Sequence, residues 1–107
     1  MAPAFISSEI YRATGYRGNH PLAIARVGPV MSLCEMLGWF TEDAPYLQSP
    51  QASLGTITRF HKADYVAALR EAEVAGRVSP EARETYNIGT MENPVFQGLY
   101  QRASTSL

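Results

Sequence analysis

Residues 86–107, YNIGTMENPVFQGLYQRASTSL, hold a glycine-containing loop, a helix start and an apolar repeat in succession. Asn93 and Pro94 together are typical of a helix start. The asparagine side chain accepts an orphan backbone N–H, and proline in the first turn forfeits no donor that the helix needs. Apolar side chains then recur at helical spacing on one face: Val95, Phe96, Leu99, Tyr100 and Ala103. The stretch therefore predicts a helix that starts at residues 93–94 and runs toward the end of the chain.

This predicted helix has no signal for its own end. The final residues, STSL, include no glycine, proline or basic side chain of the kind that closes a helix. Two interpretations stay open: a natural terminus whose polar residues fray, or a larger domain that is truncated at this point.

The first half of the chain predicts one strand and one helix. Residues 4–11, AFISSEIY, mix apolar and β-prone side chains over the length of a strand. Apolar residues recur at spacings of three and four from Val27 to Phe40, which predicts one buried helix face. Pro29 places the start of regular helix near residue 29, with 21–28 as an irregular lead-in. The lone strand still needs a hydrogen-bonding partner.

Three short helices are predicted in the second half. Ser49-Pro50 and Ser79-Pro80 each pair a capping hydroxyl with a proline suited to the first helical position. Gly76 is suited to the left-handed conformation that ends a helix. The predicted ranges are 49–60, 61–76 and 79–84.

Composition favours one small domain that binds neither nucleic acid nor membrane. The 107 residues are 46% hydrophobic and carry a net charge of −1, so nothing attracts the chain to a polyanion. No apolar run approaches the ~20 residues of a membrane span, and no leader peptide is recognisable. The single cysteine, Cys34, lies in an apolar run, which favours a buried packing role and a reducing compartment. We expect a soluble, cytoplasmic protein.

The residues needed for hydrolytic chemistry are sparse. A catalytic metal requires about three protein ligands, and the chain offers only His20, His61, Asp43 and Asp64, without metal-ligand spacing. His61 and Asp64, three apart, are expected to act as a cap and hydrogen-bond partner, and His20 as a turn-stabilising residue. The residues alone therefore predict no catalytic residue and no metal ligand in this chain.

Two charged residues leave alternatives open. Arg26 lies among apolar neighbours, where a guanidinium either extends to the surface or lines an internal polar passage. Glu92, beside the expected Asn93 cap, either favours the helix dipole or accepts backbone N–H groups of a bound substrate.

Three ordered motifs resemble the histone deacetylase superfamily, most closely its bacterial acetoin-utilization and acetylpolyamine-amidohydrolase-like branch. They are GYRGNHPLAIARV at 15–27, TRFHKADYV at 58–66 and YNIGTMENPVFQGL at 86–99, and the resemblance covers residues 8–107. In that family a His-Pro loop leads to a basic residue, an aromatic-His-x-x-Asp-Tyr motif precedes a helix, and a Gly-x-x-Asp/Glu-x-Pro loop opens another. Three motifs in order are more specific than any one of them.

The resemblance implies an arginase-like α/β fold, with a mostly parallel sheet covered by helices. Residues 1–107 would be the truncated N-terminal part of one such domain, mostly helical with about one strand. It also implies zinc-dependent removal of acetyl groups from acetyl-lysine or acetylpolyamine-type substrates. By resemblance the zinc ligands, the catalytic histidines and the oxyanion-stabilising tyrosine lie beyond Leu107, so zinc is expected in the full domain and no cofactor in this chain.

The resemblance assigns this chain only peripheral roles. Glu92 matches the acidic rim position that holds the substrate backbone, although the family often has Asp there. Arg26 matches the basic residue of the channel through which acetate leaves, and Tyr16 and Gly18 fall in a loop near the active-site mouth. The remaining matched positions are structural: His20, Pro21, His61, Asp64, Tyr65, Asn93 and Pro94.

We therefore expect a deacetylase segment that is inactive alone. Such a segment would self-associate or pair with the missing remainder of its domain, because apolar faces meant for the sheet would be uncovered. Two alternatives remain: a free-standing helical interaction module descended from such an enzyme, and a half-enzyme completed by another chain.

Overall fold

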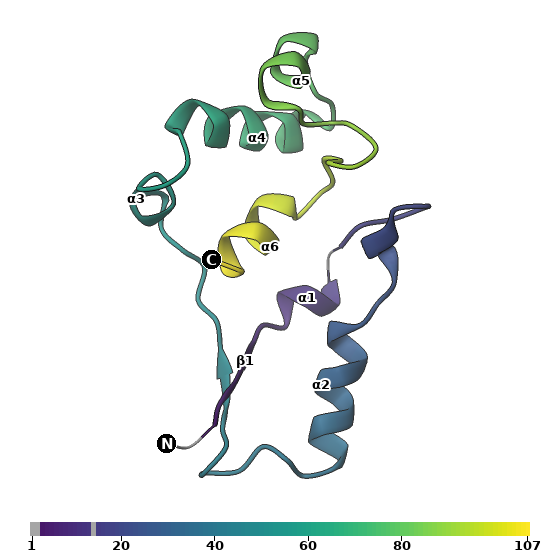
Figure 1. Cartoon of the computed structure of the whole chain (residues 1–107), viewed down its shortest axis with the longest axis vertical. Helices are drawn as coiled ribbons and strands as arrows, with labels where there is room; N and C mark the ends of the chain where they lie inside the picture. Colours follow the sequence, from purple (N-terminus) through teal and green to yellow (C-terminus); the bar gives the residue numbers. More distant parts are fainter. Residues whose placement is uncertain (1–2, 14) are drawn as a thin grey trace.

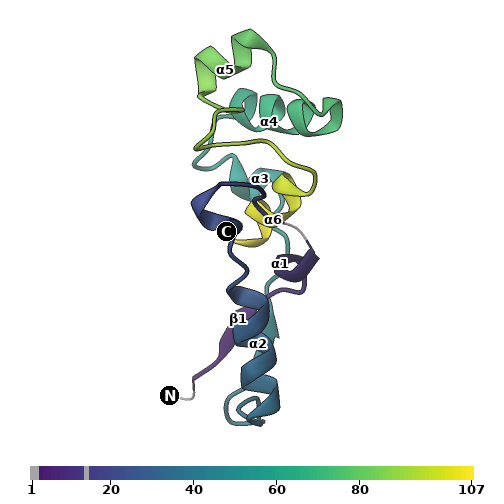
Figure 2. The same cartoon turned by 90° about the vertical axis from the view of Figure 1, so that its right-hand side faces the viewer.

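The structure, a computed structural model, describes residues 3–13 and 15–107. The molecule is elongated and flat, with principal extents of 49 × 33 × 19 Å. One end holds the two strands and α2, and the other holds α4 and α5 (Figures 1 and 2). No helix in the described part of the chain is long and apolar enough to cross a membrane.

A two-stranded parallel sheet forms one end. β1 (Phe5–Ser7) pairs with β2 (Tyr46–Gln48), with Phe5 opposite Tyr46. The predicted strand over 4–11 is thus too long, because the Ser8 side chain accepts the Ile10 N–H and turns the chain into α1 (Ile10–Ala13). The expectation of about one strand is also wrong, since three residues are too few to show the alternation that marks a strand.

The helix α2 (Val27–Met36) packs along this sheet after a 3-10 turn at Pro21–Ala23. It starts two residues before the predicted start at Pro29. Proline is tolerated there because backbone N–H groups in the first turn of a helix have no intrahelical acceptor, so the N–H that proline lacks breaks no hydrogen bond. Met31 and Cys34 are buried, as the cysteine's apolar setting predicted. Ser7 donates to the Met31 sulfur at 3.3 Å, joining the strand to the helix.

Three helices follow β2 along the chain. α3 (Leu54–Ile57) is capped by Ser53, so the predicted start at Ser49-Pro50 is wrong, and residues 49–52 form no helix or strand. α4 (Ala63–Ala75) ends at Gly76 with φ 72°, as predicted. α5 (Pro80–Tyr86) has the predicted Ser79 cap and extends two residues beyond Glu84.

The last helix, α6 (Leu99–Thr105), begins well after the predicted position. Its N-cap is Gly98, with φ 91°. Asn93 instead braces a loop, because its side chain donates to the Asn87 carbonyl at 3.0 Å and its own carbonyl accepts the Gly89 N–H at 2.8 Å. The Asn-Pro signal at 93–94 therefore stabilises a turn, another structure that this pair favours.

α6 lies between α4 and α1 in Figure 1 and is held at both ends. At its start, the Glu73 carboxylate accepts the Tyr100 N–H at 2.7 Å, and the Arg70 guanidinium lies 4.5 Å from the Tyr100 ring centroid. At its end, the 49–52 segment donates to two carbonyls of the last turn: the Ser49 hydroxyl to Thr105 and the Ala52 N–H to Ser104. The STSL ending is thus hydrogen-bonded, with Ser104 and Thr105 buried.

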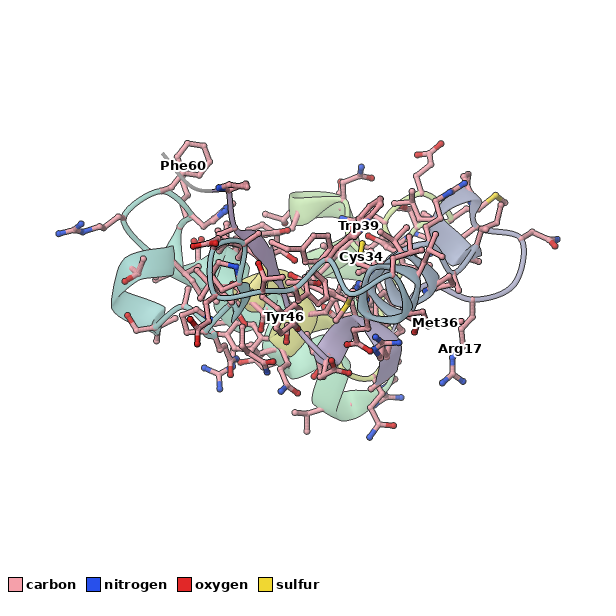
Figure 3. The ribbon with its side chains drawn as sticks, turned by 90° about the horizontal axis from the view of Figure 1, so that it is seen from below. Arg17, Cys34, Met36, Trp39, Tyr46 and Phe60 are labelled. Carbon is pink, nitrogen blue, oxygen red and sulfur yellow. The ribbon has the colours of Figure 1, made fainter. Side chains whose placement is uncertain are left out.

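The apolar core is small and much apolar surface is exposed. The buried apolar residues are Met31, Cys34, Ile57, Val66, Ala72, Ile88 and Leu99. Met36 is 84% exposed and Phe60 is 89% exposed, and Figure 3 shows Phe60 projecting away from the ribbon on the side opposite Arg17. Ile6 and Leu47 on the two strands are also exposed.

Candidate functional site

Two of the three sequence motifs meet at the ring of His20. Its Nδ1 accepts the backbone N–H of Leu22 at 3.0 Å, and its Nε2 lies 3.1 Å from the backbone carbonyl oxygen of Glu92, 72 residues away. A neutral imidazole has one donor and one acceptor nitrogen. Because Nδ1 accepts, Nε2 carries the proton and donates a hydrogen bond to the Glu92 carbonyl oxygen.

Aromatic packing completes this junction. The Tyr16 ring stacks on His20 with the centroids 4.1 Å apart and an interplanar angle of 15°. The Phe96 ring meets Tyr16 edge-on at 5.1 Å. We call Tyr16, His20, Glu92 and Phe96 the rim cluster. It joins the loop over 15–20 to the loop over 87–98.

The local backbone explains how each loop presents its residues. Gly18 has φ 65°, which only glycine adopts without strain. Pro21 opens the 3-10 turn that places the Leu22 N–H over His20. In the second loop, Thr90 Oγ1 accepts the Asn93 N–H at 3.0 Å and the Glu92 side chain is exposed.

A cavity of about 670 Å³ adjoins the rim cluster. Tyr16 lines it as well as stacking on His20, so the cavity and the rim share a wall. Four arginines also line it: Arg12, Arg17, Arg26 and Arg102. Arg26 lies just before α2, and its side chain is exposed while it lines this cavity.

One arginine of this cavity is anchored by several partners. Arg12 Nη1 donates to the Ser32 hydroxyl at 2.8 Å and to the Gly28 carbonyl at 3.2 Å, and Arg12 Nε pairs with Glu9 at 2.9 Å. Arg102 lies over the Tyr11 ring, 4.9 Å from its centroid. The cavity therefore has a basic lining that α1, α2 and α6 hold in place.

The third motif lies apart from the rim cluster, at the start of α4. Asp64 accepts a 2.9 Å hydrogen bond from the Tyr86 hydroxyl, and this bond, the largest cause, lowers the pKa of the Asp64 carboxyl and raises that of the Tyr86 phenol. The Tyr65 ring lies 5.7 Å from Tyr86 and 6.1 Å from His61. These residues join α4 to α5.

The residues present do not fit a zinc ion. Within 3–13 and 15–107, no three His, Cys, Asp or Glu side chains come close enough together to hold a metal. Zinc is held by three or four such ligands.

Two residues of these contacts were not predicted from the sequence, Phe96 in the rim cluster and Tyr86 beside Asp64. Phe96 was expected on a helix face and instead packs on Tyr16. Tyr86 was not singled out at all, although it is the partner of Asp64. No local pattern in the sequence signals this contact, because its two residues are 22 positions apart.

Comparison with known proteins identifies relatives along almost the whole chain. No family model matches it. The chain is 31% identical over 100 residues to the acetoin utilization protein AcuC of Bacillus subtilis (strain 168), a match covering 94% of this chain and 25% of AcuC.

Two solved structures share the fold. One is a histone deacetylase homologue complexed with SAHA, with a TM-score of 0.88, 32% identity, and coverage of 99% of this chain and 28% of that one. The other is a histone deacetylase homologue from Aquifex aeolicus, with a TM-score of 0.85, 31% identity, and coverage of 97% and 28%. The chain thus spans about a quarter of the length of the relatives that it matches. In sequence and in fold, the chain is related to the histone deacetylase superfamily, and it corresponds to one portion of those longer proteins.

Proposed function

We propose that this chain is the N-terminal segment of a zinc-dependent deacetylase and supplies part of its substrate rim and product channel. The observation that carries the proposal is the wall that Tyr16 shares between the rim cluster and the arginine-lined cavity. A rim that presents an acid beside a basic cavity suits a reaction that takes in an amide and releases a carboxylate. The substrates would be acetyl-lysine or acetylpolyamine-type amides.

Glu92 is the substrate-binding residue in this proposal. Its carboxylate is exposed on a loop whose backbone is braced by His20 and Asn93. An exposed carboxylate accepts N–H groups of a substrate, and a fixed backbone reduces the ordering cost of that contact. Glu92 precedes α6 by several residues, so an interaction with the dipole of this helix does not explain the presence of an acid at this position.

Arg26 is the product-channel residue. It lines the cavity that Tyr16 separates from the rim. A guanidinium presents paired donors that match the two oxygens of an acetate. Residues outside these 107 would close the side on which Arg26 is now exposed.

The zinc ion belongs to the rest of the domain. When bound, it supplies Lewis-acid polarisation of the amide carbonyl and an activated water. Its ligands must come from residues outside this chain, because the described residues offer no such group. We therefore infer that the 107-residue chain is inactive alone. We also infer that it resides in the cytoplasm. Exposed apolar side chains such as Met36 and Ile6 would pair it with the remainder of its domain or with a second copy of itself.

The test uses the protein as it occurs in its source cells. Its intact mass establishes whether these residues are joined to a longer chain, and an acetyl-lysine peptide is the substrate probe. We expect Glu92→Ala to raise KM about tenfold, as for loss of a charge-assisted hydrogen bond, with the melting temperature little changed. Glu92→Gln, which keeps an acceptor oxygen, should fall between.

Two results would count against the proposal. Parallel loss of melting temperature and activity in Glu92→Ala would reduce Glu92 to a structural role. A native mass of 107 residues, with no zinc or deacetylation gained in any complex isolated with it, would favour the free-standing interaction module instead.

A further inference from the structure

We propose that His20 is a positioning residue whose Nε2–H fixes the backbone of Glu92 and so aims the Glu92 side chain. What Glu92 contacts rests on the proposed function, whereas the positioning itself rests on the geometry of this chain. The key relationship is a hydrogen bond across 72 residues, from one loop motif to the other.

The His20 ring is constrained on three sides. Nδ1 accepts the Leu22 N–H at 3.0 Å, Nε2 lies 3.1 Å from the Glu92 carbonyl oxygen, and the ring face stacks on Tyr16 at 4.1 Å. A ring held by two directional bonds and one stacking contact has little freedom to rotate or flip.

The first hydrogen bond determines the second. Leu22 is in the 3-10 turn, and its N–H uses the His20 side chain as its cap. Nδ1 must therefore be unprotonated, which puts the proton of the neutral ring on Nε2, where it points at Glu92. The hydrogen bond that caps the 3-10 turn thus selects the tautomer in which Nε2–H can donate to the Glu92 carbonyl in the second loop.

The hydrogen bond from His20 acts on the backbone of Glu92, the acidic residue of the rim cluster. The Glu92 carbonyl is followed by the Asn93 N–H, which donates to Thr90 Oγ1, so both sides of this peptide unit are held. Because the peptide unit that follows Glu92 is held at both its C=O and its N–H, the direction in which the Glu92 side chain leaves the backbone is restrained. Loss of the His20 contact should leave the rim acid in place but poorly aimed.

Two substitutions separate the two nitrogens of the ring. His20→Asn puts an acceptor oxygen near the position of Nδ1 and preserves the cap on Leu22, but it does not reach Glu92. His20→Gln puts a donor nitrogen near the position of Nε2 and preserves the contact to Glu92, but it loses the cap. The pair is matched because each variant keeps one bond and loses the other.

The first measurement is NMR on the native protein, in the longer chain or complex in which these residues occur. Two-bond proton–nitrogen spectra should show His20 protonated on Nε2 and unprotonated on Nδ1. The Glu92 carbonyl shift and the motions of residues 90–93 should change in His20→Asn and stay near wild type in His20→Gln. The opposite tautomer, tautomer averaging, or equal behaviour of the two variants would overturn the proposal; the tautomer test needs no variant to fold.

The second measurement is kinetic, on the native protein with an acetyl-lysine peptide. We expect His20→Asn to raise KM about three- to tenfold, the range for one neutral hydrogen bond, with kcat within about twofold and recovery in His20→Gln. If Glu92→Ala leaves KM unchanged, the proposed function falls while the NMR result still decides the role of His20. If Glu92→Ala raises KM but the NMR criteria fail, His20 loses its role and Glu92 keeps its own.

Discussion

The Tyr86 hydroxyl donates a 2.9 Å hydrogen bond to Oδ2 of Asp64, while Oδ1 of the same carboxylate accepts the Tyr65 N–H at 3.0 Å. Asp64 is in the first turn of α4 and Tyr86 is the last residue of α5. One carboxylate thus serves its own helix start and ties it to the neighbouring helix.

This bond should make stability depend on pH at both ends of the scale. The Tyr86 bond lowers the pKa of Asp64 from its ordinary 3.8, so the stability it contributes is present above that value and is lost as pH falls through the folded pKa. The same bond raises the pKa of Tyr86 from 10.0, so this contribution is lost as pH rises past that value. Urea unfolding across pH should show wild type more stable than Tyr86→Phe in between, with the curves converging at both extremes. A constant offset between the curves would contradict this account.

Glu73 of α4 should stabilise the start of α6 by supplying the side-chain acceptor that its N-cap residue, Gly98, lacks. Its carboxylate is the acceptor for the Tyr100 N–H at 2.7 Å. Because loss of a helix N-cap costs about 0.5–2 kcal/mol, we expect Glu73→Ala to lower the free energy of unfolding by about 1 kcal/mol. Glu71→Ala is the matched control, since Glu71 is on the same helix and exposed. Equal denaturation midpoints for the two variants would remove Glu73 from this role.

Gly89 should tolerate no side chain. It has φ 76°, and a Cβ built there would lie 2.5 Å from a Val78 methyl carbon. Gly38 also has positive φ, at 68°, but nothing lies within 4 Å of its Cβ position. Both alanine variants carry the left-handed strain of about 1 kcal/mol, and only Gly89→Ala adds a clash, so thermal melting should fall further for it. Adding Val78→Ala should restore part of that difference; no recovery would mean that the clash is not its cause.

Arg26→Ala in the native protein should slow turnover while zinc content stays the same. If Arg26 binds the carboxylate product on its way out, loss of this charge-assisted contact should slow product release and lower kcat about tenfold. Arg77→Ala is the control, because Arg77 is exposed and lies beyond the end of α4. Steady-state rates on an acetyl-lysine peptide and metal analysis provide the measurement. Unchanged kcat would leave Arg26 as a surface arginine.

Local signals in the sequence predicted the elements whose causes are local. Gly76 at the end of α4 and Ser79-Pro80 at the start of α5 each act within a few residues, and both predictions are confirmed. The relationship to histone deacetylases, predicted from three motifs, is also confirmed.

Tertiary contacts overrode the remaining local signals. Ser49-Pro50 has the chemistry of a helix start, yet the Ser49 hydroxyl is used by Thr105, 56 residues later. Asn93-Pro94 has the same chemistry, yet Asn93 is used by Asn87 and Gly89. Tyr16, His20 and Glu92 were named from the sequence one by one, but their assembly into the rim cluster was not predicted, because the contact of His20 with Glu92 exists only once the chain has folded.

The anchoring of the last turn of α6 by the 49–52 segment imposes an order on biosynthesis. Ser49 leaves the ribosome well before Thr105, and at about 5–20 residues per second the intervening 56 residues take roughly 3–11 seconds. During that interval β2 can already pair with β1, but the 49–52 segment cannot yet form its hydrogen bonds to α6, because α6 has not been synthesised. Newly made chains should therefore pass through a stage in which the strand end is assembled and the α6 end is open to chaperones.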